Sequence, residues 1–124
     1  PVQASSRIYS SQDIERWHIN EMKSLLSRFS GVKFIFDNVK QKYYPVLRDA
    51  ITSFRSKNEG KPLVVIDDTP FIDFDILDYP VNDIEEIFLL KGSDAAIWGP
   101  KASNGIIVII TQRGKSTKIE QKEE

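Results

Sequence analysis

Carboxylate side chains are concentrated between residues 67 and 86, and no Lys or Arg occurs between Lys61 and Lys91. Paired carboxylates can hydrolyse glycosides, and carboxylate oxygens can bind calcium. The spacing lacks the glycine and the final glutamate of an EF-hand loop, and a chain of 124 residues offers little room for a sugar cleft. We therefore predict a solvated acidic face, with Asp73, Asp75 and Asp78 as its candidate interaction residues.

Other catalytic or metal-binding side chains are scarce. His18 is the only histidine and cysteine is absent, whereas zinc sites and catalytic triads require several such partners. The sequence contains no G-x-S-x-G elbow, no P-loop and no G-x-G-x-x-G motif. We expect no enzymatic activity, no cofactor and no metal. A small carboxylate-based hydrolase or a calcium-binding module is kept as a remote alternative.

Two further groups could contact a partner. Lys40, Lys42 and the pair Tyr43-Tyr44 could neutralise and stack a nucleic acid strand, but a net charge of −1 does not favour this, and we predict a solvated loop. Trp98 is expected on a short helix. Core packing is the default for such a tryptophan, and a partner contact is the alternative.

The composition is that of one globular domain. Of 124 residues, 40% are hydrophobic and 28% are charged, and no apolar run approaches the roughly 18 residues of a membrane-spanning helix. The chain begins with Pro1, so we infer a processed or excised polypeptide. We predict a flexible lead-in over residues 1–9, a domain over 10–115 and a charged tail over 116–124.

The first third of the sequence predicts two short helices. Ser10 and Asp13 form a capping-box-like pair ahead of a helix over residues 12–17. Asn20 can cap a second helix, whose apolar face has the i, i+3, i+4, i+7 spacing and consists of Met22, Leu25, Leu26 and Phe29. Gly31 follows and suits the left-handed position after a helix. Residues 32–36 predict a strand.

The stretch over residues 45–54 fits two structures. Pro45 could occupy the first position of a helix, and the following apolar residues fit one helical face. Alternation of Ala50, Thr52 and Phe54 fits a strand equally well. Local pattern alone leaves this choice open.

Two β-branched runs, residues 63–66 and 106–111, predict strands that are covered on both faces. Residues 84–90 predict a third strand, preceded by a turn that Asn82 can cap. A short helix over residues 93–98, capped by Ser93, is expected to end at Gly99.

Four segments share features with one known family: SQDIERWHINEMKSLLSRFSGVKF, KPLVVIDDTPF, VNDIEEIFLLKGSDAAIWG and ASNGIIVIITQRGK. Together they resemble the plug domain of TonB-dependent outer-membrane receptors, in particular the SusC-like group. The resemblance covers residues 10–115, and its last two segments are the most specific. Its structural motif positions are the turn and cap residues Gly31, Asp67, Gly92, Gly99, Asn104 and Gly105.

The sequence departs from the family pattern at two positions. Asp68 replaces the usual glycine after Asp67, although a tight turn there requires positive φ, which aspartate tolerates less well. Pro100 stands where a small polar residue is usual. We also find no segment like a TonB box before Ser10 and no barrel-like strand after Gly114.

The resemblance implies an α+β fold: a small mixed sheet of about four strands with short helices packed on it. It also implies that the stretch before the polar loop ends as a strand near residues 51–55. The implied function is non-enzymatic gating of nutrient uptake through a β-barrel of the same polypeptide, driven by TonB, in the outer membrane of a Gram-negative bacterium. A barrel-less plug-like interaction module in a larger periplasmic or surface protein is the alternative.

Overall fold

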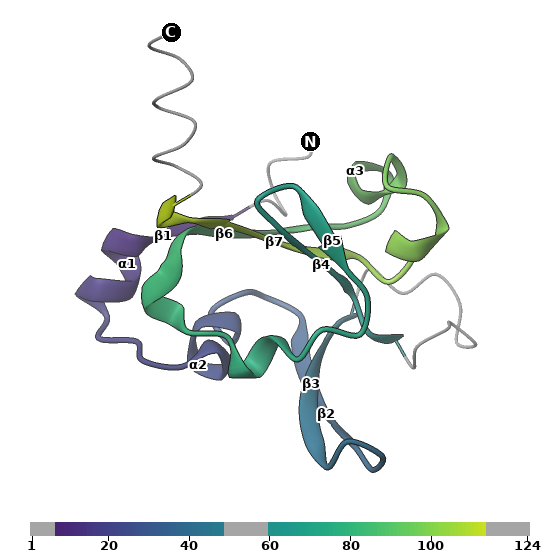
Figure 1. The fold of residues 1–124 in the computed structure, drawn as a ribbon, viewed down its shortest axis with the longest axis horizontal. Helices are drawn as coiled ribbons and strands as arrows, with labels where there is room; N and C mark the ends of the chain where they lie inside the picture. The colour runs from purple at the N-terminus through teal and green to yellow at the C-terminus, as the bar shows by residue number, and fades with distance from the viewer. Residues whose placement is uncertain (1–6, 49–59, 114–124) are drawn as a thin grey trace, which may run out of the picture.

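The computed structural model describes residues 7–48 and 60–113. Its main feature is a five-stranded mixed sheet (Figure 1). The strand order is β1 (Ile8–Ser10), β6 (Ile84–Leu90), β7 (Ile106–Thr111), β4 (Leu63–Ile66) and β5 (Thr69–Phe71). The β4–β7 pair is parallel and the others are antiparallel. The predicted α+β class is confirmed, with five strands in this sheet where about four were expected.

The centre of the sheet is the pair of β-branched runs. Strands β4 and β7 lie side by side in parallel, with Leu63 opposite Ile106 and Ile66 opposite Ile109. Both strands are mostly buried, as their uniformly apolar sequences predicted. Alternate residues therefore contribute to separate cores on the two faces of the sheet.

Short helices cover both faces (Figure 1). On one face, α1 (Ser11–Arg16), α2 (Met22–Leu26) and the 3-10 turns η4 (Ile76–Asp78) and η5 (Val81–Asp83) pack over the larger core. On the other, α3 (Ser93–Ala96) and η6 (Pro100–Ala102) pack over a smaller core of Leu63, Val65, Ala95, Ala102 and Ile106.

The caps of the first two helices differ. Ser10 forms the expected capping box with Asp13, since each side chain accepts a hydrogen bond from the backbone N–H of the other residue. Helix α2 begins one residue later than predicted: its N-cap is Glu21, not Asn20, and it has no side-chain cap. Its predicted apolar face is buried, and packing of that face holds the short helix in place.

Strands β2 (Val32–Asp37) and β3 (Lys42–Leu47) form a separate antiparallel hairpin that projects away from the main sheet (Figure 1). The solvated loop expected around Tyr43-Tyr44 is therefore wrong, as is a helix starting at Pro45, which pairs with Phe34. A two-stranded hairpin consists of edges only, where proline is tolerated and tyrosine is favoured. The strand expected near residues 51–55 lies outside the described residues.

The N-terminal lead-in is also shorter than expected. Ile8 and Tyr9 belong to β1, which pairs with β6 at the edge of the sheet. Tyr9 is buried, packs edge-on against Trp17 and donates a hydrogen bond of 2.8 Å to the carbonyl of Arg28. A strand of three residues is too short to show a periodic pattern, so the sequence did not reveal it.

Candidate functional site

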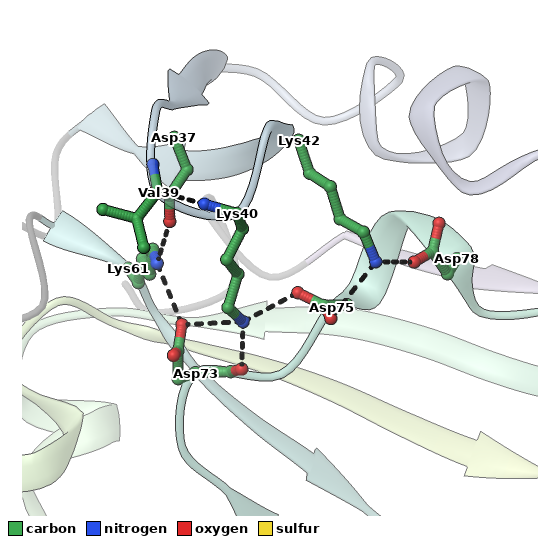
Figure 2. A network of polar contacts seen from close by, with 8 residues as sticks. All are labelled: Asp37, Val39, Lys40, Lys42, Lys61, Asp73, Asp75 and Asp78. Atoms are coloured by element: carbon green, nitrogen blue, oxygen red, sulfur yellow. Dashed lines mark hydrogen bonds and ion pairs between the residues drawn. The ribbon is translucent and has the colours of Figure 1, made fainter.

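Within the described residues, a group of seven charged side chains joins three separate parts of the chain (Figure 2). It combines the tip of the β2–β3 hairpin, the residue before Pro62 and the segment that runs from β5 into η4. We call it the ion-pair network; its members are Asp37, Lys40, Lys42, Lys61, Asp73, Asp75 and Asp78.

The inner end of the network is centred on Lys61. Its Nζ donates to Asp37 Oδ2 at 2.7 Å and to Asp73 Oδ1 at 2.9 Å. The Lys61 and Asp37 side chains are only 14% and 8% exposed. Asp37 also accepts the backbone N–H groups of Val39 and Lys40 at 2.9 and 3.2 Å, so one carboxylate both caps the hairpin turn and fixes Lys61.

The outer end alternates lysines with aspartates. Lys40 Nζ lies 2.8 Å from Asp75 Oδ1 and 3.2 Å from Asp73 Oδ1, and it donates to the Asp73 carbonyl at 3.0 Å. Lys42 Nζ lies 2.7 Å from Asp78 Oδ2 and 3.4 Å from Asp75 Oδ2. Each lysine thus bridges two carboxylates, as the dashed lines in Figure 2 show.

Hydrogen bonds within the network favour the charged forms of its three lysines and of Asp37, Asp73 and Asp75. Hydrogen bonds from Lys61 and Lys40 lower the pKa of Asp37, Asp73 and Asp75. Burial opposes the charge of Lys61, but its bonds to Asp37 and Asp73 outweigh burial and raise the pKa of its ammonium. Bonds to Asp75 and Asp78 likewise raise the pKa values of Lys40 and Lys42.

These shifts oppose acid–base catalysis near neutral pH. A general acid or base requires a pKa close to the working pH, whereas here carboxylates are shifted down and ammonium groups up. The cavity behind the network measures about 20 Å³, room for roughly one water molecule. The network connects three separate parts of the chain.

A second polar contact joins the β4–β5 turn to the end of β7. Asp67 and Asp68 form the two-residue turn, with φ of 49° and 71°. Two positive φ values are the mark of a type I′ hairpin turn. The Asp67 carboxylate accepts the Thr111 backbone N–H at 2.9 Å and also the Thr111 hydroxyl. This contact ties the turn to the central strand.

Comparison with known proteins identifies the family of this chain. A family model described as the TonB-dependent receptor plug domain matches residues 2–106. The chain belongs to this family. The match includes the segment over residues 81–99 that carried the resemblance, and it ends at Ile106, the first residue of β7.

Solved structures show the same fold. A mutant of the ferric enterobactin receptor PfeA from Pseudomonas aeruginosa, solved with enterobactin, matches with a TM-score of 0.66 and 19% identity, over 87% of this chain and 17% of that receptor. The siderophore receptor PirA from Acinetobacter baumannii matches with a TM-score of 0.65 and 20% identity, again over 87% and 17%. This plug domain therefore spans about one sixth of the length of the receptors it matches.

The predicted interaction residues of the plug domain have different surroundings. Asp73, Asp75 and Asp78 do not form a purely solvated acidic face, because each of them pairs with a lysine. Their contact with a partner stays a prediction. Trp98 is half-buried and packs against the smaller core. No sequence pattern singles out Asp37, and only the contrast between the acidic run and the surrounding lysines indicates such pairing.

The motif glycines serve turns in three different ways. Gly99 has φ of 84° between α3 and η6, although α3 ends earlier than predicted, with Ile97 as its C-cap. The N-cap of α3 is Gly92, not Ser93. Gly31 has φ of 83° but lies in the turn directly before β2 and not at a helix end, since α2 ends with Ser27 as its C-cap.

Asn104 and Gly105 position the start of β7. Asn104 is buried and its Nδ2 donates to the Lys61 carbonyl at 3.2 Å, while Lys61 itself belongs to the ion-pair network. Gly105 has φ of 90°, whereas Asn104 does not have a positive φ. Asn82 likewise does not cap η5, whose N-cap is Pro80.

Within residues 7–48 and 60–113, no three His, Asp or Glu side chains are arranged to hold a metal ion. His18 is exposed, with φ of 55° after α1. No helix of the same ranges is long and apolar enough to cross a membrane.

Proposed function

We propose that this plug domain fills the lumen of an outer-membrane β-barrel formed by the same polypeptide and gates nutrient uptake. The observation that carries the proposal is the plug-domain match over residues 2–106. TonB, drawing on the proton-motive force, would rearrange the domain and open the passage. Gating of this kind is steric and electrostatic, and the domain breaks no covalent bond.

The architecture supports this role. A domain that blocks a channel must be compact. Here helices cover both faces of the sheet and enclose two separate apolar cores. The charged side chains near the hairpin are mutually neutralised, with three lysines bridging four aspartates: Asp37, Asp73, Asp75 and Asp78. Paired charges can face a water-filled lumen without requiring a bound ligand.

The finer assignment is to the SusC-like group of these receptors. It rests on the segment over residues 81–99, which includes β6 and α3, and on the following run into β7. The location that follows is the outer membrane of a Gram-negative bacterium.

A permeability experiment tests gating without knowledge of the transported nutrient. In the natural bacterium, residues 10–113 are deleted in frame from the full-length gene, and sensitivity to vancomycin is measured, since intact outer membranes exclude this large hydrophilic antibiotic. If the domain blocks a barrel, its removal leaves an open channel and the cells become more sensitive than wild type.

Deletion of the whole gene is the matched control, because it removes the channel together with the plug. Sensitivity equal to wild type in both strains, with the truncated protein present in the outer membrane by immunoblot, would contradict gating. The domain would then be better described as a plug-like interaction module without a barrel.

A further inference from the structure

The β2–β3 hairpin is attached to the rest of the domain in two chemically different ways. Its inner half is anchored by apolar packing: Leu47 is fully buried, Val46 is buried, and Val32 and Phe34 pack against the larger core. The outer half carries the network residues Asp37, Lys40 and Lys42 at and beside the turn.

The outer half presents apolar side chains to solvent. Val39 at the turn is 90% exposed, and Tyr43 and Phe36 are 51% and 41% exposed and contact each other edge-on. Apart from the ion pairs, this half contacts the body through the hydrogen bond from Lys40 Nζ to the Asp73 carbonyl at 3.0 Å and through Lys23 Nζ, 5.2 Å from the centre of the Tyr43 ring. Polar contacts of charged side chains, with little apolar packing, therefore hold the outer half of the hairpin against the rest of the domain.

The ion pairs at the outer end are individually weak. Lys42 and Asp78 are 46% and 63% exposed, and exposed pairs contribute little because water and salt screen them. A two-stranded hairpin has marginal stability in water once it loses its neighbours. Release of the outer half would therefore also unpair its strands.

We propose that the outer half of the hairpin, residues 36–43, is a releasable arm that the ion-pair network latches onto the segment after β5. Release leaves the inner half anchored through Leu47 and opens the small cavity behind the network, whose lining includes Val64, Phe74 and Ile76. The latch responds to ionic strength through its four outer pairs, whereas the Lys61–Asp37 pair, 14% and 8% exposed, is screened much less. The proposal concerns the folded domain itself and does not depend on the gating function.

Hydrogen exchange measured by mass spectrometry on the full-length protein tests the latch. In the K40Q/K42Q variant, four ion pairs are lost: Lys40 with Asp73 and Asp75, and Lys42 with Asp75 and Asp78. At low salt we expect exchange in peptides over residues 36–43 to accelerate about tenfold, the combined factor for four exposed pairs of ordinary strength. Peptides over β7 should not change.

Salt and two control variants separate the latch from general destabilisation. Wild-type protein in 1 M NaCl should approach the low-salt behaviour of K40Q/K42Q, because the screening length falls to about 3 Å. K40R/K42R, which keeps the charges, should retain protection. K33Q removes an exposed lysine of the inner half that lies outside the network, and it should behave as wild type.

Two results would overturn the proposal. One is equal exchange of residues 36–43 in K40Q/K42Q and K33Q at low salt. The other is acceleration that extends equally to the β7 peptides, which would mean that the network stabilises the whole domain and not a separate arm. Either result is independent of the vancomycin experiment, so the latch and the gating function can fail separately.

Discussion

Replacement of Asp67 by alanine should destabilise the domain more than any other single change in the β4–β5 turn. The carboxylate accepts two hydrogen bonds from Thr111, one from the backbone N–H at 2.9 Å and one from the hydroxyl. Thr111 is buried, so its donors cannot all turn to water when the carboxylate is removed. Asp67 also has φ of 49°, which alanine adopts less readily than aspartate.

The expected loss is about 3 kcal/mol: roughly 1 kcal/mol for each hydrogen bond and roughly 1 kcal/mol for alanine at positive φ. Asp68→Ala is the matched control. Asp68 has φ of 71°, but no hydrogen bond of its side chain is seen in the described structure, so its replacement should cost only the backbone part, about 1 kcal/mol. Asp67→Asn keeps one acceptor oxygen and should lose about 1 kcal/mol.

Equilibrium urea unfolding of the chain measures these differences. A loss of about 3 kcal/mol moves the midpoint by roughly 2 M urea for a domain of this size. Thr111→Val, made alone and together with Asp67→Ala, should show coupling of about 1 kcal/mol between the two side chains. Equal losses for Asp67→Ala and Asp68→Ala would refute the reasoning, because the contact with Thr111 would then contribute nothing.

Three more outcomes are expected. Asp68→Gly should raise the free energy of unfolding by about 0.5 kcal/mol in urea titrations, because glycine adopts its positive φ without strain; a loss would contradict this. Gly105→Val, at φ of 90°, should lower the melting temperature through a strain on the order of 1–3 kcal/mol, and an unchanged melting temperature would contradict it. The stabilisation that K40Q/K42Q removes should be constant between about pH 5 and pH 9. The network aspartates with lowered pKa contribute fully above their ordinary value of 3.8, and this part is lost as the pH falls through their folded-state values. The lysines contribute fully below 10.5, and this part is lost as the pH rises through their raised values. A step near pH 7 in thermal melts of the two proteins would contradict this.

The centre of the fold was predictable because its signal is local. Residues 63–66 and 106–111 are β-branched and apolar at nearly every position, and a strand buried on both faces is the simplest structure for such a run. The capping box at Ser10 is local as well, since both partners lie within four residues. Features of this kind depend little on the rest of the chain.

Residues 32–36 predicted strand β2, but its partner β3 and the ion-pair network were not predictable, for the opposite reason. The sequence Lys42-Tyr43-Tyr44-Pro45 has no apolar alternation, and Pro45 suits the start of a helix as well as an edge strand. Lys61 and Asp37 are 24 residues apart, and Lys42 and Asp78 are 36 apart, so no spacing rule pairs them. The charge contrast along the chain indicated attraction, but only the fold selects partners.

The parallel contact between β4 and β7 determines when the domain can form during synthesis. Strand β7 lies between β6 and β4 and is the last strand of the described chain to be made. Until Ile106 and the residues after it are available, the β1–β6 pair and the β4–β5 hairpin are two separate antiparallel pairs without a common neighbour. In a nascent chain that stops before this point, β6 and β4 each have an edge without its partner strand, so we do not expect it to fold as a smaller version of the domain.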